Sequence, residues 1–443
     1  MLTTVRRKLE ALKNHQGFRR YAANTSWMMA EQMLRIIAGL LVGIWVARYL
    51  GPEQFGLFSY VLAFTAIFGG IAKLGLDSIL VRELVNQPEL RDAYLGTAFW
   101  LKFIGAFIVV ALVALIVPFT SNDNTTNLFI FIIAAGLIFQ SFDVVEFYFQ
   151  SQVLAKLVSI CKLTQLTLSS IIKVYLVLTQ AGLVWFVIVT AFDALSLAVS
   201  YFVAYKIRVN TNFFKSFDCG VAKKLLSSSW PLIFSGLVLM IQARIDQVMI
   251  KEFRGSVEVG YYSVAMRLIE AVAFMPMLVK NSLFPAIQSA KKVSRALYIE
   301  RLLNFYRLNV ILFLIFSIPL YFFAEHIVVF LFGKDYQPAG ILLSLLCIRL
   351  FFANMGVARS VYLLSENLMK FSLITMVLGT VVNITLNYMW IPEYGAKGAI
   401  VATIISFSVS IFLVDLSYSK TRPNVFLQIR SILTFYKLNL KSS

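Results

Sequence analysis

The sequence has few charged residues and few side chains of the kinds that bind metals or carry out catalysis. Only 14% of its 443 residues are Asp, Glu, Lys or Arg, and it contains two histidines and three cysteines. Cys161, Cys219 and Cys347 are far apart and form no metal-ligand or CxxC spacing, so we expect neither a metal site nor a disulfide framework. His15 and His326 have no evident catalytic partner. We therefore expect no catalytic residues, no cofactor and no enzymatic activity.

Apolar residues dominate the chain instead. Hydrophobic residues make up 59% of it, and the mean hydropathy is +0.80, values that predict a polytopic membrane protein. The net charge of +18 does not indicate a nucleic-acid partner, because no module of interleaved basic and aromatic residues is visible. Basic residues in short loops between apolar spans more often report the orientation of the chain in the membrane.

Apolar stretches long enough to cross a bilayer, which takes about 20 residues, recur along the whole chain. Twelve candidate spans are 22–47, 55–76, 93–117, 127–149, 155–178, 183–205, 228–250, 259–285, 303–324, 338–362, 369–391 and 396–418. Lys and Arg gather in every second connection, beginning with the N-terminal one. Because basic residues collect on the cytoplasmic side, both termini are predicted to be cytoplasmic.

The spans fall into two groups of six, separated by a polar stretch near the midpoint. We predict a basic amphipathic leader on the cytoplasmic surface at 1–21, an N-terminal six-helix bundle at 22–205 and a cytoplasmic linker at 206–227. A C-terminal six-helix bundle follows at 228–418. The basic segment 419–443 is too interrupted by charge to span a membrane, so it is predicted to lie at the interface.

A segment of the first half recurs in the second half after a shift of 204 residues. ARYLGPEQFGLFSYVLAF, from Ala47, aligns with KEFRGSVEVGYYSVAMRL, from Lys251, and pairs Gly51 with Gly255, Gly56 with Gly260 and Ser59 with Ser263. Repetition at this scale is typical of secondary transporters, whose ligand sites lie between the two halves. Chance similarity between two apolar hairpins is the alternative explanation.

Several basic residues lie inside predicted spans, where a charge costs about 2.5 to 3.5 kcal/mol. Arg35 follows Glu31 by one helical turn, and Arg267 precedes Glu270 by three residues. Both pairs are either intrahelical ion pairs or parts of a cationic cavity between the bundles. The other central cations are Arg244 and Lys173. Four further basic residues, Lys73, Lys102, Arg307 and Arg359, lie near span ends, where we expect them to extend toward the interface.

A cavity lined by Arg and Lys would suit an anion, and guanidinium groups favour phosphate. Carboxylates occur in the spans too, at Asp143, Glu146, Asp193, Asp246 and Asp415. Such groups either bind coupling ions or serve as partners of nearby cations.

Motifs spread from Ala23 to about Tyr418 carry a family resemblance. They are NTSW, ARYLGPEQFG, LGLDSILVRELV, FYFQSQ, SWPLIFSGLVLMIQARIDQVMI, GYYSVAMRLIEAV and LFGKDYQPA. In combination they resemble the polysaccharide-transporter branch of the multidrug/oligosaccharidyl-lipid/polysaccharide (MOP) superfamily, with O-antigen (Wzx-type) flippases as the nearest group. The resemblance implies an all-α fold of twelve transmembrane helices in two six-helix bundles related by pseudo-twofold symmetry.

The same resemblance implies a function and a set of binding residues. The implied substrate is an undecaprenyl-pyrophosphate-linked oligosaccharide, moved across the bacterial inner membrane by alternating access, with a polysaccharide polymerase and a chain-length regulator as further partners. By similarity to peptidoglycan-precursor flippases, Arg35 and Arg267 would bind the pyrophosphate, with Arg244, Lys173 and Arg48 as further candidates. Coupling to a proton or sodium gradient is implied as well, and its candidate carboxylates are Glu31, Glu270, Asp246 and Asp143.

Two other functions are weighed against this one. A multidrug or cation antiporter of the same superfamily would favour an acidic or aromatic pocket, whereas the central spans here favour Arg and Lys. A polysaccharide polymerase would need a catalytic constellation near a membrane face and usually a large external loop, whereas the predicted outer loops are short.

Overall fold

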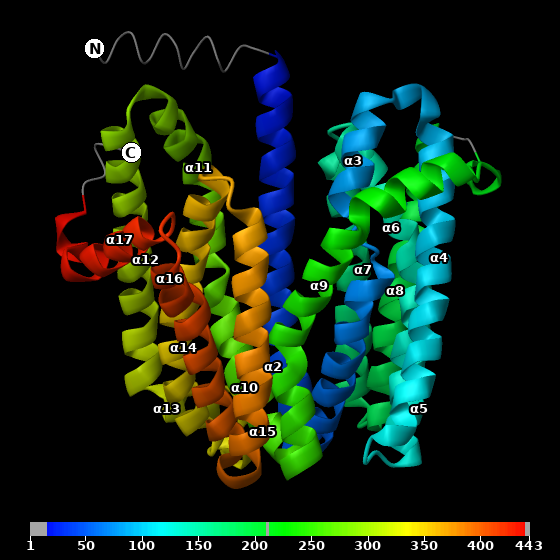
Figure 1. Cartoon of the computed structure of the whole chain (residues 1–443). Helices are drawn as coiled ribbons and strands as arrows, with labels where there is room; N and C mark the ends of the chain where they lie inside the picture. The colour runs from blue at the N-terminus through cyan, green and yellow to red at the C-terminus, as the bar shows by residue number, and fades with distance from the viewer. Residues whose placement is uncertain (1–15, 210–211, 439–443) are drawn as a thin grey trace. The chain divides into compact units, whose positions relative to one another are not determined.

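The computed structural model describes residues 16–209 and 212–438, and the regular elements in these ranges are helices (Figure 1). The described chain forms two compact units. Unit 1 contains the chain up to Val46 and Phe64–Met240, and unit 2 contains Ala47–Ala63 and the chain from Ile241 onward. The all-α fold predicted from the sequence is confirmed. The first 15 residues of the predicted leader lie outside the described residues.

Unit 1 is built from helices that pack around an aromatic core. Its elements are parts of α2 (Gln16–Ala72), α3 (Asp77–Asn86), η1 (Pro88–Leu90), α4 (Arg91–Ile116), η2 (Val117–Phe119), α5 (Asn124–Gly136), η3 (Leu137–Phe142), α6 (Asp143–Ser151), α7 (Ala155–Leu178), α8 (Leu183–Val209), η4 (Phe213–Lys215) and the first part of α9 (Cys219–Arg254). The core includes Tyr94, Phe99, Phe149, Tyr201 and Phe213, all of them buried.

The stretch 206–227, predicted to link two bundles, packs into unit 1 within its described part. Phe213 is buried, and the ring of Phe214 lies 4.9 Å from that of Phe99. Trp100 Nε1 donates a hydrogen bond to the Phe214 carbonyl at 2.9 Å, and the Asp218 amide donates to Thr97 Oγ1 at 2.9 Å. The two units therefore divide the chain elsewhere, at 46/47, 63/64 and 240/241. This partition differs from the predicted boundaries.

Unit 2 holds the hairpin residues 47–63 of α2, the end of α9 and the remaining elements. These are α10 (Ser256–Ala273), α11 (Met275–Val293), α12 (Arg295–Phe322), α13 (Ala324–Phe332), η5 (Lys334–Tyr336), α14 (Ala339–Ser365), α15 (Met369–Ser408), the π-helix η6 (Val409–Leu413), α16 (Val414–Ser417), α17 (Arg422–Leu433) and η7 (Phe435–Lys437). Within this unit α14 packs against α10, α12 and α15.

Ten helices in the described part of the chain are long and apolar enough to cross a membrane, so the predicted count of twelve is not exact. Two of the ten each contain two predicted spans. Helix α2 joins spans 22–47 and 55–76 across Gly51 (φ 70°), and α15 joins spans 369–391 and 396–418 across Gly395 (φ 58°). Both glycines have a positive φ that other residues rarely reach, so each marks a kink at which one helical segment ends and the next begins.

The predicted repeat reappears in the backbone. Gly51 has φ 70° and ψ 172°, and Gly255, its partner at the shift of 204, has φ 87° and ψ 179°. Each begins a helix segment, α2 from Pro52 and α10 from Ser256. This shared conformation at the aligned glycines supports repetition over chance similarity.

The C-terminal segment forms a helix that lies against α12 (Figure 1). Its inner face is polar, with Asn424, Gln428 and Ser431 fully buried, and Tyr306 of α12 donates a hydrogen bond to Asn424 Oδ1 at 2.7 Å. Its outer face exposes Phe426 and Leu433. An exposed apolar face on a short helix is typical of a segment at the membrane interface.

Candidate functional site

The predicted pair on α2 forms within unit 1. Arg35 Nε donates a hydrogen bond to Glu31 Oε1 at 2.7 Å, and Arg35 Nη2 contacts the same oxygen. The two side chains differ in environment, because Glu31 is 8% exposed and Arg35 is 39% exposed. The carboxylate is therefore shielded while part of the guanidinium remains open to a ligand.

The other candidate cation of unit 1, Lys173, has a partner on a neighbouring helix. Its Nζ lies 2.8 Å from Asp193 Oδ2 on α8 and 2.8 Å from Ser169 Oγ. Two helices of the same unit thus neutralise one another's partly buried charges. Lys173 is fully engaged, and this arrangement favours a packing role over ligand binding.

Asp143, a predicted ion-coupling candidate, lies beside a buried lysine. Lys102 Nζ is 3.6 Å from Asp143 Oδ2 and 3.9 Å from Asp77 Oδ1, and the Lys102 side chain is only 1% exposed. The expectation that Lys102 reaches the interface was wrong. Its neighbours in the fold supply two carboxylates and the ring of Phe147, whose centroid is 4.9 Å away, so the charge is compensated inside the unit.

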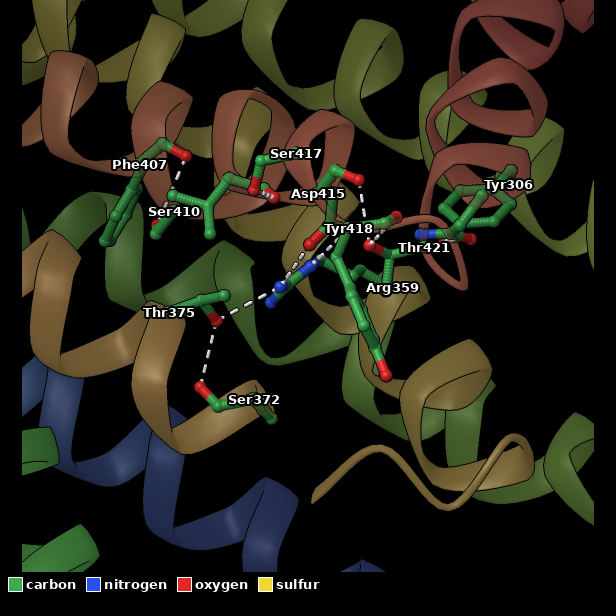
Figure 2. A network of polar contacts seen from close by, with 12 residues as sticks. Tyr306, Arg359, Ser372, Thr375, Phe407, Ser410, Asp415, Ser417, Tyr418 and Thr421 are labelled. Carbon is green, nitrogen blue, oxygen red and sulfur yellow. Dashed lines mark hydrogen bonds and ion pairs between the residues drawn. The ribbon is translucent and has the colours of Figure 1, made fainter. Parts of the chain in front are cut away.

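Arg359 was also expected to extend toward the interface, and it too is buried. Figure 2 shows its guanidinium directed at Asp415. The pair is bidentate, with Nε at 2.8 Å from Oδ2 and Nη2 at 2.6 Å from Oδ1, and Thr375 accepts a further bond at 3.1 Å. Side-chain exposure is 8% for Arg359 and 0% for Asp415. Arg307, the third such residue, is buried by contacts with Thr434 and the Lys437 carbonyl near the C-terminus.

Of the two alternatives considered for Arg267 and Glu270, the intrahelical ion pair on α10 does not form. Glu270 Oε1 instead lies 3.3 Å from Arg244 Nη1 of α9. The Arg267 guanidinium stands 5.4 Å from the ring centroid of Phe55, and its buried Nη1 has no hydrogen-bond partner among the described residues. A three-residue spacing allowed the pairing but could not show that a neighbouring helix would offer the carboxylate a different arginine.

Arg48, the last basic candidate, is exposed on the turn before Gly51. The structure gives it no charged partner within the described residues. The Arg48 side chain lies close to Gly333. A Cβ atom added to Gly333 would be 3.9 Å from Arg48 Nε.

Asp246 occupies a different kind of site, deep in unit 2. It is 5% exposed and accepts hydrogen bonds from Tyr262 Oη at 2.8 Å, Thr403 Oγ1 at 2.7 Å and Asn387 Nδ2 at 2.7 Å. Asn383 joins the network, donating to Thr403 Oγ1 at 3.1 Å. These donors come from α10 and both parts of α15. Every donor to Asp246 in the described structure is neutral.

The sequence analysis did not identify the residues around Asp246. Asn383 and Asn387 are one helical turn apart in an apolar stretch, so they share a face of α15, and Thr403 is a further polar residue in the next span. That spacing was the available signal. Arg349 of α14 is a further basic residue outside the predicted site, and its Nη1 lies 3.5 Å from Met266 Sδ while its buried Nε has no partner among the described residues.

The ten long apolar helices in the described part of the chain indicate a multi-pass membrane protein. A solved structure of the lipid II flippase MurJ in an inward closed conformation matches with a TM-score of 0.70, at 16% identity over 92% of this chain and 91% of that one. An inward-facing multidrug resistance MATE family transporter of the MOP superfamily matches with a TM-score of 0.69, at 15% identity over 94% and 98%. The predicted MOP fold is thereby confirmed.

The chain belongs to the family described as "Polysaccharide biosynthesis protein", whose model matches residues 21–291. Sequence relatives include the capsular polysaccharide biosynthesis protein CapF of Staphylococcus aureus, 20% identical over 89% of this chain and 97% of that protein. The probable flippase AglR of Haloferax volcanii is 22% identical over 88% and 82%. An uncharacterized membrane protein of Methanocaldococcus jannaschii is 29% identical over 204 residues, and this match spans 46% of each chain.

Proposed function

We propose that this protein is a flippase that moves an O-antigen-type oligosaccharide, linked to undecaprenyl pyrophosphate, across the bacterial inner membrane by alternating access. The family and the relatives named for polysaccharide biosynthesis and for a flippase support a lipid-linked glycan as the substrate class. The fold shared with the lipid II flippase is consistent with it. Both termini would be cytoplasmic, and a polymerase and a chain-length regulator would take over the product outside.

The observation that carries the proposal is the state of Arg267. Its guanidinium lies in the middle of an apolar helix, and its buried Nη1 makes no hydrogen bond within the described structure. A charge placed there costs about 2.5 to 3.5 kcal/mol, and an unsatisfied buried donor adds roughly 1 to 3 kcal/mol. A bound phosphate would offset both costs, because it accepts charge-assisted hydrogen bonds from guanidinium.

Arg35 would be the corresponding phosphate ligand of unit 1. Its pairing with Glu31 uses Nε and Nη2, which leaves one amino group and an exposed edge for an incoming anion. Arg244 is held only by a long contact of 3.3 Å to the half-exposed Glu270, so it would complete the phosphate contacts in unit 2. Lys173 is a weaker candidate because Asp193 and Ser169 occupy its amine.

We further propose that transport is coupled to protons or sodium through Asp246. Three of the four carboxylates predicted for coupling have a cationic partner: Glu31 has Arg35, Glu270 has Arg244 and Asp143 has Lys102. Asp246 has only neutral donors in the described structure. The carboxylate oxygens of Asp246 and the neighbouring hydroxyl oxygens of Tyr262 and Thr403 are hard ligands that suit a proton or a small cation.

The function is tested by expressing the protein in a strain that lacks its own O-antigen flippase and measuring lipid-linked sugars by mass spectrometry. We expect surface glycan to return and the accumulated lipid-linked intermediate to fall. The Arg267→Ala variant, present in the membrane at normal amount, should restore neither. If the unmodified protein changes neither quantity in strains with several different repeat units, the proposal is wrong.

A further inference from the structure

We infer that Arg349 is the internal counter-charge of Asp246 and competes with the coupling cation for that carboxylate. The inference rests on the proposed coupling function of Asp246. It assigns to Arg349 a positioning role that determines how tightly the cation is held and whether it can leave.

The carboxylate of Asp246 is buried in unit 2. Its two oxygens accept three hydrogen bonds from neutral donors, Tyr262, Thr403 and Asn387. None of these donors compensates a negative charge on the carboxylate. A buried negative charge without a positive partner is costly, so a cation from the protein itself would stabilise the emptied site.

Arg349 is the candidate for this internal counter-charge. Arg349 Nη1 contacts Met266 Sδ at 3.5 Å, and Met266 lies one helical turn after Tyr262 on the same face of α10. Tyr262 is the residue whose hydroxyl donates to Asp246. Arg349 and Asp246 therefore approach Tyr262 and its face of α10 from two other helices, α14 and α9.

Arg349 is free to change partners. Among the described residues it has no acidic partner, its Nε makes no hydrogen bond, and its guanidinium stands 5.5 Å from the ring centroid of Phe407. A sulfur atom and an aromatic ring hold a guanidinium weakly compared with a carboxylate. By contrast, Arg359 in the same unit is fixed by a bidentate pair.

The charged groups that face the Asp246 network are few. Arg349 and Glu270 both interact electrostatically with Tyr262, and Glu270 is already engaged with Arg244. Gln247, next to Asp246 in sequence, bonds the neutral Ser263 at 2.9 Å. Arg349 is thus a positive charge beside the Asp246 network that no carboxylate in the described part of unit 2 neutralises.

Two arrangements of this cluster follow. With a cation on Asp246, the like charge of Arg349 is repelled and remains over Phe407. When the cation leaves, Arg349 moves toward Asp246 and compensates it, so that the empty carrier is not left with a bare buried charge. Such an element with two discrete states is what converts ion binding into a change of conformation.

The test is equilibrium binding of ²²Na⁺ to the purified full-length protein, repeated at several pH values so that competition by protons is measured as well. Removal of the competing charge in Arg349→Gln should tighten cation binding by roughly tenfold or more and slow cation release. Arg349→Lys, which keeps the charge, should bind close to the wild type. Arg307→Gln is the matched control, because it removes another buried guanidinium of unit 2 that contacts the C-terminal segment instead.

Melting temperatures of the same samples separate this effect from misfolding. A variant that merely loosened the fold would bind the cation more weakly, whereas the inference requires tighter binding. An Arg349→Gln protein that binds Na⁺ and protons with unchanged or lower affinity overturns it. The wild-type protein could also restore surface glycan yet bind neither Na⁺ nor protons. That result would overturn the inference about Arg349 but would leave the proposed flippase function unaffected.

Discussion

Gly56 of α2 and Gly260 of α10 meet at a helix crossing that leaves no room for a side chain. A Cβ at Gly56 would overlap the Ser256 carbonyl and lie 2.7 Å from the Gly260 amide, and a Cβ at Gly260 would overlap the Pro52 carbonyl. The shift of 204 residues relates Pro52 to Ser256 and Gly56 to Gly260. The glycine of each repeat therefore meets, in the other repeat, the residue equivalent to the one that its partner meets. The two copies of the repeated hairpin therefore pack on each other within unit 2.

Alanine at Gly56 should destabilise the protein. The added methyl group would force the two backbones apart, and such overpacking costs about 1 to 3 kcal/mol. We expect a lower melting temperature of the detergent-solubilised protein and reduced transport. Alanine at Gly39, earlier in the same helix, has no atom within 4 Å of the added Cβ and serves as the control. Equal melting temperatures for the two variants would contradict a tight crossing.

This crossing also shows what sequence alone could provide about the fold. The repeated glycines identified the hairpins, because Gly51 and Gly255 each need a positive φ and begin a helix. The partition of the chain could not be read in the same way. Residues 47–63 belong to unit 2 because Gly56 and Phe55 pack on α10 residues, and such contacts between distant segments leave no local signal.

Neutralising either member of the buried pair Arg359 and Asp415 should be costly. Removal of one charge leaves the other buried without a partner, which typically costs 3 to 5 kcal/mol. We expect Asp415→Asn and Arg359→Gln each to lower the melting temperature strongly. The double variant should lower it by less than the sum of the two single decreases. The partly exposed pair Arg91 and Asp92, with side chains 28% and 37% exposed, offers a control, since Arg91→Gln should have a smaller effect. Additive effects in the double variant would show that the pair is not a coupled unit.

The site could be predicted only in part, and the buried ion pairs explain why. Sequence spacing indicated Arg35 with Glu31 because both lie on one helix face. Lys102, Lys173 and Arg359 instead find their carboxylates on other helices. Which face of each helix meets which neighbour is decided by packing, so a pair formed between helices is not visible in the spacing within either one.

The cluster around Glu366, in the turn between α14 and α15, should make stability depend on pH. Burial raises the pKa of Glu366, but hydrogen bonds from Arg295 and Lys291 outweigh it, so the pKa is lowered from the ordinary value of 4.5. A carboxyl with a lowered folded pKa contributes stability above its unfolded pKa and loses it as the pH falls through the folded one. The melting temperature of the wild type should exceed that of Glu366→Gln at pH 7, and the difference should shrink as the pH falls below the unfolded pKa of Glu366 and vanish once the pH is below the lowered folded pKa. Glu89→Gln, at an exposed position, should show no such pH-dependent difference.

Replacement of Arg267 or Arg35 by alanine should abolish glycan export while the protein stays in the membrane. Loss of one charge-assisted phosphate contact corresponds to roughly a ten- to hundredfold drop. Lysine should restore activity only partly, because an ammonium group cannot make a bidentate contact. Surface glycan, quantified against membrane-inserted protein, measures the effect. Arg254→Gln, at a half-exposed position beside Glu258, is the control, and normal export by the alanine variants would argue against phosphate binding at these residues.

Asp246→Asn should separate transport from its driving gradient. Asparagine keeps the size of the side chain, and its Oδ1 can still accept from Thr403 and Tyr262. Its amide nitrogen would face the donor Nδ2 of Asn387, so the Asn387 amide must turn to offer its oxygen. The charge that would attract a cation is gone. The assay uses proteoliposomes loaded with a lipid-linked oligosaccharide. We expect transport by the wild type to accelerate when a proton or sodium gradient is imposed. The variant should move substrate slowly, at a rate that depends on neither gradient. Glu300→Gln removes an exposed carboxylate from the same unit and should respond to the gradient as the wild type does. If Asp246→Asn still follows the gradient, then a carboxylate that already has a cationic partner, such as Asp143, must release that partner to bind the ion, and coupling would proceed through unit 1.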